Sequence, residues 1–279
     1  MNGGKKIISS LTLNIILSVV VIILIGVIIA YCIGRGSTLG SDQQKAAESS
    51  QSATQDLSDN KITKDNGTQR SAPSTERVTS DLYGRQVIYP AGSDPTPLTT
   101  KIKESVDRCK ISPQVTIQMA SGAQTMWSEN SGPTTLDHGV PTGYSSDVTG
   151  AALAAWNYRT MVYGGGELSN TVVHSYADFG DDQEEMLAHD FSEESENEVG
   201  FKILAPTAVR VLTCKKDFVV LEHLNRVYGD QDGVFETPIY TTFRFTMKLA
   251  DNGWTLDVPA MAQGNETIRS LDGWTQWQY

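Results

Sequence analysis

The sequence feature that most constrains this chain is an uncharged apolar run at residues 11–33. At 1.5 Å per residue, a helix of this length crosses the hydrocarbon core of a bilayer, which is about 30 Å thick. Lys5 and Lys6 precede the run, whereas only Arg35 follows it closely, so the positive-inside rule places residues 1–10 in the cytoplasm. We therefore expect a single-pass membrane protein with an extracytoplasmic C-terminal part. A cleaved signal peptide is the alternative, but its apolar region would be shorter.

Composition changes sharply after the apolar run. Residues 34–80 are rich in Gln, Ser, Thr and Asp and contain few large apolar side chains. Such a segment does not bury enough surface to offset the conformational entropy lost on folding. We expect a disordered linker that holds the rest of the chain away from the membrane.

The exported part is strongly acidic. The first forty residues contain three of the 22 basic residues and none of the 33 acidic ones, so the remainder carries a formal charge of −14. A surface of this sign repels nucleic acid and anionic lipid. Direct nucleic-acid binding by this part of the chain is therefore not expected.

Residues 81–145 show no sustained periodicity. β-Branched residues predict short strands at 85–89 and 115–119, and a short helix is expected around residues 100–109. We expect an irregular arm with short strands. Cys109 in this arm and Cys214 further along would be free to form a disulfide in an oxidising compartment, and two separate buried thiols are the alternative.

The remaining residues, 146–279, show helices first and strands afterwards. An Ala-rich helix is expected at 148–163, with Asp147 as its N-cap and three glycines, 164–166, as its stop. Helices at 168–179 and 181–196 follow. Strands are expected at 208–213, 218–228 and 237–249, and a last strand begins at Trp254. Helices on one face of an antiparallel meander predict an α+β domain with a curved, cone-like sheet.

This order resembles the nuclear-transport-factor-two-like superfamily, and with a membrane anchor it resembles the periplasmic scaffold subunit of type IV secretion. A more specific likeness lies in two glycine-rich stretches and the helix start, at Gly139, Pro141, Gly143, Tyr144, Asp147, Gly150 and Trp156. These residues are similar to a family of actinobacterial single-pass proteins that occur with conjugative and integrative elements. That family has a His-Thr pair where this chain has Ser146-Asp147, and Asp147 keeps the capping chemistry.

The ionisable residues form no catalytic or metal-binding motif. No His-x-x-x-His or Cys-x-x-Cys spacing occurs, so we expect no metal, no cofactor and no catalytic residues. His174 has two interpretations: a catalytic base that faces the inside of the cone, or an ordinary histidine without a chemical role. The acidic run from Asp178 to Glu198 is interpreted either as a calcium site or as a solvent-exposed charged face. The segment from Asp230 to Gly233 resembles a shortened calcium loop, but a hairpin turn explains each of its residues.

The aromatic tail Trp274, Trp277 and Tyr279 has two interpretations, namely an exposed docking site or a cover folded over the sheet. Taken together, the resemblance implies a non-enzymatic extracytoplasmic scaffold or assembly component of a conjugation or type IV secretion-like apparatus. Its expected partners are the bilayer, other membrane or secretion-apparatus proteins and further copies of the chain. The alternative is an extracytoplasmic module that binds a small molecule or lipid as an accessory to a transporter.

Overall fold

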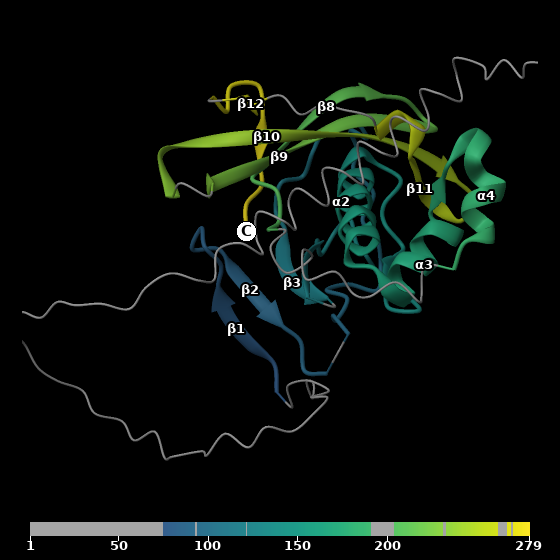
Figure 1. The fold of residues 1–279 in the computed structure, drawn as a ribbon, viewed down its shortest axis with the longest axis horizontal. Helices are drawn as coiled ribbons and strands as arrows, with labels where there is room; N and C mark the ends of the chain where they lie inside the picture. Colours follow the sequence, from purple (N-terminus) through teal and green to yellow (C-terminus); the bar gives the residue numbers. More distant parts are fainter. Residues whose placement is uncertain are drawn as a thin grey trace, which may run out of the picture. The chain divides into compact units, whose positions relative to one another are not determined.

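A computed structural model describes residues 75–92, 94–120, 122–190, 204–230, 233–261, 267–268 and 270–279. The expected transmembrane segment at 11–33 and the linker up to residue 74 lie outside these ranges. Within these ranges, no helix has both the length and the apolar character needed to span a membrane. The described part is an α+β structure dominated by sheet, which confirms the predicted class (Figure 1).

The first sheet has the strand order β1-β2-β3-β4. Its members are β1 (Arg77–Ser80), β2 (Gln86–Tyr89), β3 (Thr116–Ala120) and β4 (Ala123–Trp127). Strands β2 and β3 run parallel, and the other two pairs are antiparallel. One prediction is therefore wrong, because β1 lies inside the linker expected at 34–80. The arm at 81–145 contains short strands separated by irregular segments, as expected. It also contains the hairpin of β5 (Thr135–Asp137) and β6 (Val140–Thr142).

The short helix expected around residues 100–109 does not form. This stretch is a loop that is fastened to its neighbours by hydrogen bonds instead. The Ser105 amide donates to the carboxylate of Asp147, and the Arg108 carbonyl accepts from the Val148 amide. Contacts to a distant helix end therefore override the weak local preference for a helix.

The helical layer contains three α-helices among the described residues. They are α2 (Val148–Gly164), α3 (Gly166–Ser175) and α4 (Gln183–Ala188), the last preceded by the 3₁₀ turn η1 (Gly180–Asp182). Gly165 and Gly166 have φ values of 72° and 70°, so the three glycines form a turn between two helices. Helix α3 ends earlier than expected, because β7 (Ala177–Asp178) pairs in parallel with β11.

The second sheet contains the predicted meander. Its order is β13-β8-β9-β10-β11-β7, with β12 beside β10. Its remaining members are β8 (Ala208–Cys214), β9 (Phe218–Asp230), β10 (Gly233–Ala250), β11 (Gly253–Asp257), β12 (Thr267–Ile268) and β13 (Thr275–Gln276), and the 3₁₀ turn η4 (Pro259–Met261) follows β11. Strands β8 to β11 pair antiparallel in sequence order, as predicted.

Helix α2 lies between the two larger sheets (Figure 1). On one side the Trp156 indole donates to the Gln124 carbonyl, and the Asn157 amide bonds both the N–H and the carbonyl of Met126 on β4. On the other side the His223 ring on β9 donates to the Ala152 carbonyl. Every residue from 148 to 161 is buried. Small side chains on all faces of the helix allow both sheets to approach it closely, which explains its lack of an amphipathic stripe.

Candidate functional site

The glycine-rich motif before α2 builds the N-terminus of that helix. The Asp147 carboxylate accepts the amides of Thr149 and Gly150, both at 3.0 Å, and the Ser145 hydroxyl at 2.6 Å. A Cβ on Gly150 would lie 2.1 Å from the Ser145 carbonyl oxygen, so no larger residue fits there. The predicted cap is confirmed, and it is a buried structural element.

The rest of the motif supports the same corner of the fold. Gly139 completes the β5–β6 turn and Pro141 lies buried on β6, while Gly143 has a φ of 75° and leads into Tyr144. The Tyr144 hydroxyl accepts a hydrogen bond from Asn157, and burial raises its pKa. The motif, together with the buried Trp156, therefore contributes to packing.

The two cysteines of the expected exported part are joined. Cys109 and Cys214 form a disulfide with a Cα–Cα distance of 5.7 Å, across a sequence separation of 105 residues. The bond links the loop that covers the start of α2 to the C-terminal end of β8. Sequence reasoning left this pairing open, because no local pattern shows that the two residues meet.

His174 does not face the interior. Its side chain is exposed, and its ring nitrogens contact the carbonyls of Asn170 and Leu187, which links α3 to α4. The idea of a base inside a cone is therefore wrong for this residue. The buried histidine is His223, which the sequence analysis did not single out because strand periodicity alone does not reveal burial. Burial lowers the pKa of His223 to about 3, and the charge of Arg159 adds to this effect.

Asp178, the first residue of the acidic run, takes part in an ion pair. Asp178 and Asp257 contact the Lys248 ammonium at 2.8 and 2.9 Å. Hydrogen bonds from Lys248 and from the Gly180 amide lower the pKa of Asp178. Among the described residues, no group of three or more metal-ligating side chains comes together. The acidic run beyond residue 190 lies outside the described residues, and Asp230 and Gly233 lie opposite each other in the β9–β10 hairpin.

The aromatic tail folds back onto the sheet. Trp277 is 6% exposed and lies beside His223, with ring centroids 6.3 Å apart. The Trp274 ring covers the Arg210 guanidinium at 4.6 Å, and the Tyr279 hydroxyl donates to the Pro206 carbonyl. Trp277 and Tyr279 nevertheless reach a cleft, so this tail both covers the sheet and contributes to a surface.

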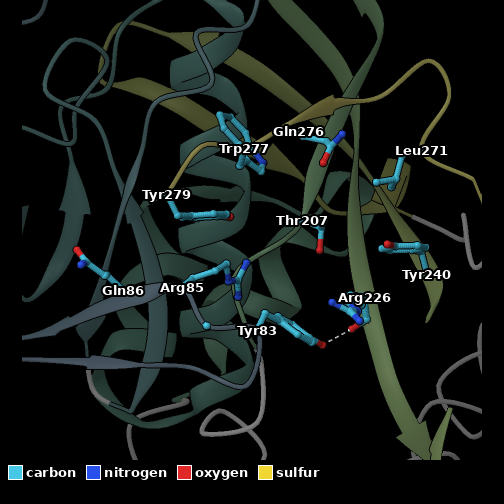
Figure 2. A pocket seen from close by; sticks show the side chains of 11 residues that line it. Tyr83, Arg85, Gln86, Thr207, Arg226, Tyr240, Leu271, Gln276, Trp277 and Tyr279 are labelled. Carbon is cyan, nitrogen blue, oxygen red and sulfur yellow. Dashed lines mark hydrogen bonds between the residues drawn. The ribbon is translucent and has the colours of Figure 1, made fainter. Parts of the chain in front are cut away.

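That cleft lies where the first sheet, the β9–β10 ribbon and the C-terminus meet. Its volume is about 630 Å³. Figure 2 shows Trp277 and Tyr279 on one side, Arg226 and Tyr240 on the other, and Thr207 between them. The other residues that line it are Tyr83, Gly84, Arg85, Gln86, Leu271 and Gln276. Three tyrosines, a tryptophan and two arginines therefore surround one concave surface.

Two guanidinium groups flank the ring of Tyr83 in this cleft. Arg85 and Arg226 each lie 5.1 Å from the ring centroid, and the Tyr83 hydroxyl donates to the Arg226 carbonyl at 2.7 Å (Figure 2). Burial raises the pKa of Tyr83, and the charges of the two arginines oppose this rise. Sequence reasoning missed these residues, because they come from separate strands and turns with no shared motif.

The two arginines differ in whether their charge is balanced by a carboxylate. Arg85 is fully engaged: its side chain pairs with Asp81 at 2.7 Å and also bonds the Ala205 carbonyl and the Gln124 side chain. Arg226 has no carboxylate partner among the described residues, and its Nε is buried without a hydrogen bond in that part of the chain. The cleft therefore presents one positive charge that the described part of the fold does not neutralise.

A family model described as "Domain of unknown function (DUF8175)" matches residues 90–276. The matched range begins just after β2 and ends at the last residue of β13, so it includes α2, the meander and five of the eleven residues that line the cleft, Arg226 among them. No curated protein and no solved structure matches the chain significantly.

Proposed function

This chain belongs to the DUF8175 family, and we propose that it is a membrane-anchored, non-enzymatic scaffold or assembly component that acts outside the cytoplasm. The apparatus we propose for it is a conjugation or type IV secretion-like machine. The uncharged run at 11–33, the polar linker and the resemblance of the glycine-rich motif support this assignment.

The observation that carries the proposal is the Cys109–Cys214 disulfide. Disulfides persist in oxidising compartments and are rare where thiols are kept reduced. This bond joins two parts of the fold that are 105 residues apart, so it is part of the architecture of the domain. It agrees with the orientation derived from Lys5 and Lys6, which leaves the folded domain on the outer side of the membrane.

The arrangement of the second sheet supports the likeness to the cone-like superfamily. Helices α2 and α3 precede the antiparallel meander, and α2 packs on its inner face through His223, whose ring lies beside that of Phe245. Because a helix and aromatic side chains fill this face, there is less support for the alternative of a lipid or other apolar ligand inside the cone. We propose that the sheet β1–β4 is an addition to the cone.

The titratable side chains support a binding role over a catalytic one. His223 is buried and bonded to a helix carbonyl, His174 joins two helices, and Glu222 is held between two arginines. Each of these groups has a role in holding the fold. We therefore propose that the function lies in surfaces that contact partners.

The compartment is tested by labelling cysteines in intact cells with a maleimide that does not cross the membrane. We expect Cys109 and Cys214 to react only after reduction, and the same two residues changed to serine give the blank. If both residues stay unlabelled in intact cells after reduction with an impermeant phosphine, yet react once the cells are lysed, the extracytoplasmic assignment is contradicted.

The assembly role is tested in the host by pull-down and transfer. Tagged full-length chain is captured from membranes that carry the transfer genes, and conjugation is measured in a deletion strain. We expect channel components in the captured material and reduced transfer that a plasmid copy restores. Normal transfer with no channel component captured would refute the scaffold role.

A further inference from the structure

We propose that the cleft around Arg226 binds an acidic peptide segment of a partner protein, with a carboxylate of that segment seated on the Arg226 guanidinium. This inference rests on the proposed function, because it names the partner chemistry that an assembly component would use. It is carried by three independent features of the cleft: its charge, its lining and its position in the sheet.

The charge argument begins with Arg85. Its Nε lies 2.7 Å from Asp81, one Nη lies 2.8 Å from the Ala205 carbonyl, and its side chain is only 12% exposed. This arginine therefore belongs to the fold. The Arg226 guanidinium lies 5.1 Å from the centroid of the same tyrosine ring, and none of the described residues gives it a carboxylate.

Arg226 lines the cleft, and its charge has no acid partner in the described part of the chain. Its Nε is buried there without a hydrogen bond, so a ligand would contact the exposed part of the guanidinium. A carboxylate is the natural acceptor, because the guanidinium fork forms two parallel hydrogen bonds with it. The cleft therefore selects for an anion with planar, two-oxygen geometry.

The lining indicates a peptide and not a small inorganic ion. A volume of about 630 Å³ lies in the range of sites that hold ligands much larger than phosphate. Tyrosine, tryptophan and arginine dominate the energetics of protein interfaces, and all three residue types line this cleft. Thr207, Gln86 and Gln276 add hydrogen-bonding groups for a peptide backbone.

The position of the cleft in the sheet leaves room for such a segment. Strand β8 begins at Ala208, opposite Leu224, so it does not reach Arg226. Beyond that point only β10 pairs with β9, and Tyr240 is the partner of Arg226. The side of β9 next to Arg226 therefore has no strand from β8 beside it, and the cleft opens at this place (Figure 2).

The test measures peptide binding to the full-length chain in detergent micelles by fluorescence anisotropy. The probe is a labelled library of peptides of about nine residues, with Asp or Glu at two positions and aromatic or aliphatic residues between them. A matched library carries Asn or Gln at the acidic positions. We expect the acidic library to bind and the neutral one to bind at least about tenfold more weakly, since a charge-assisted pair is lost.

The variants assign the binding to one guanidinium. Arg226→Gln should weaken binding of the acidic library by about tenfold or more, and Arg226→Lys should restore only part of it. Arg77→Gln is the matched control, because Arg77 is an exposed arginine on β1 that covers Tyr89 and does not line the cleft. We expect this control to bind as the unchanged chain does.

Three results would overturn the proposal. They are equal binding of the acidic and neutral libraries, unchanged binding by Arg226→Gln with an unchanged melting temperature, and displacement of the peptide by inorganic phosphate as readily as by an unlabelled acidic peptide. Failure of the scaffold role gives a different pattern. Normal transfer in the deletion strain, together with peptide binding that depends on Arg226, would refute the apparatus and leave the acidic-peptide cleft in place.

Discussion

Strand β9 carries two charged regions on the same face, and they differ in how charge is balanced. Glu222 lies between Arg210 on β8 and Arg244 on β10, with N–O distances of 2.5 and 2.6 Å. Arg226, four residues further along, lies opposite Tyr240 and has no acid beside it among the described residues. One strand therefore contains both a neutralised cluster and an unneutralised cation.

The difference follows from the number of strands at each point. At Glu222 the sheet has a neighbour on both sides, so two arginines reach one carboxylate whose side chain is 2% exposed. At Arg226 the β8 neighbour is missing, and a concave surface takes its place. Burial alone would raise the pKa of Glu222, but the hydrogen bonds and charges of Arg210 and Arg244 outweigh it and lower the pKa. The first region holds the fold, and the second is available to a partner.

The largest expected effect comes from the disulfide, which fastens the end of β8 that is remote from the cleft. Replacing Cys109 and Cys214 with serine should lower the free energy of unfolding by about 4 kcal/mol, since the bond closes a loop of roughly 100 residues. Chemical denaturation of the full chain, followed by tryptophan fluorescence, measures this. Hydrogen exchange should rise first near Cys214 and residues 105–112. Faster exchange at Tyr83 and Thr207 instead would mean that the two ends of β8 are not independent.

The second effect tests the neutralised cluster. Glu222→Gln leaves two guanidinium groups without their carboxylate and should cost about 2 kcal/mol. The value lies below that of a fully buried pair, because Arg210 and Arg244 remain 37% and 41% exposed. Denaturant titration at neutral pH provides the measurement. A cost below about 0.5 kcal/mol would place this cluster among ordinary surface pairs.

The third effect uses pH to probe His223, which follows Glu222 and points to the opposite face. Its pKa is about 3 in the fold and about 6.5 when unfolded, so the unfolded chain binds the extra proton between these values. Stability should therefore fall as pH falls below 6.5, by about 1.4 kcal/mol per unit. His223→Gln should remove this slope between pH 6.5 and 5. The carboxylates of Glu222 and Asp178, whose pKa values are lowered, contribute only at lower pH. An unchanged slope in the variant would show that another group titrates.

The fourth prediction concerns a substitution that gives Arg226 a carboxylate partner, as Glu222 already gives Arg210 and Arg244. Tyr240→Glu places a carboxylate directly across the strand pair from Arg226 and should stabilise the fold by about 0.5 kcal/mol. The same change should abolish binding of acidic peptides, because the new carboxylate occupies the guanidinium. Tyr240→Gln is the control that lacks the charge. Peptide binding that survives in the glutamate variant would separate the cleft from Arg226.

The smallest effect is the removal of Arg226 itself. Arg226→Gln should change the free energy of unfolding by less than about 0.5 kcal/mol, because no ion pair in the described part is lost. Thermal unfolding beside Glu222→Gln gives the direct contrast. A loss as large as that of the glutamate variant would show that Arg226 has a structural partner, and the distinction between the two regions would disappear.

The sequence by itself determined the features that depend on neighbours along the chain. The carboxylate of Asp147 caps the helix that begins one residue later, the glycines at 164–166 end it, and alternation along β10 predicts its two faces. These signals involve residues within a few positions of each other. They are enough for the α+β class and for the order of helices and meander.

The tertiary structure decided everything that depends on residues meeting from far apart. The β1–β4 sheet combines strands of weak local signal, and the Cys109–Cys214 bond and the burial of His223 arise only when α2 is enclosed by two sheets. The contrast between Glu222 and Arg226 has the same origin. Each is a single charged residue on one strand, and the position where β8 begins determines which of them finds its counter-charge.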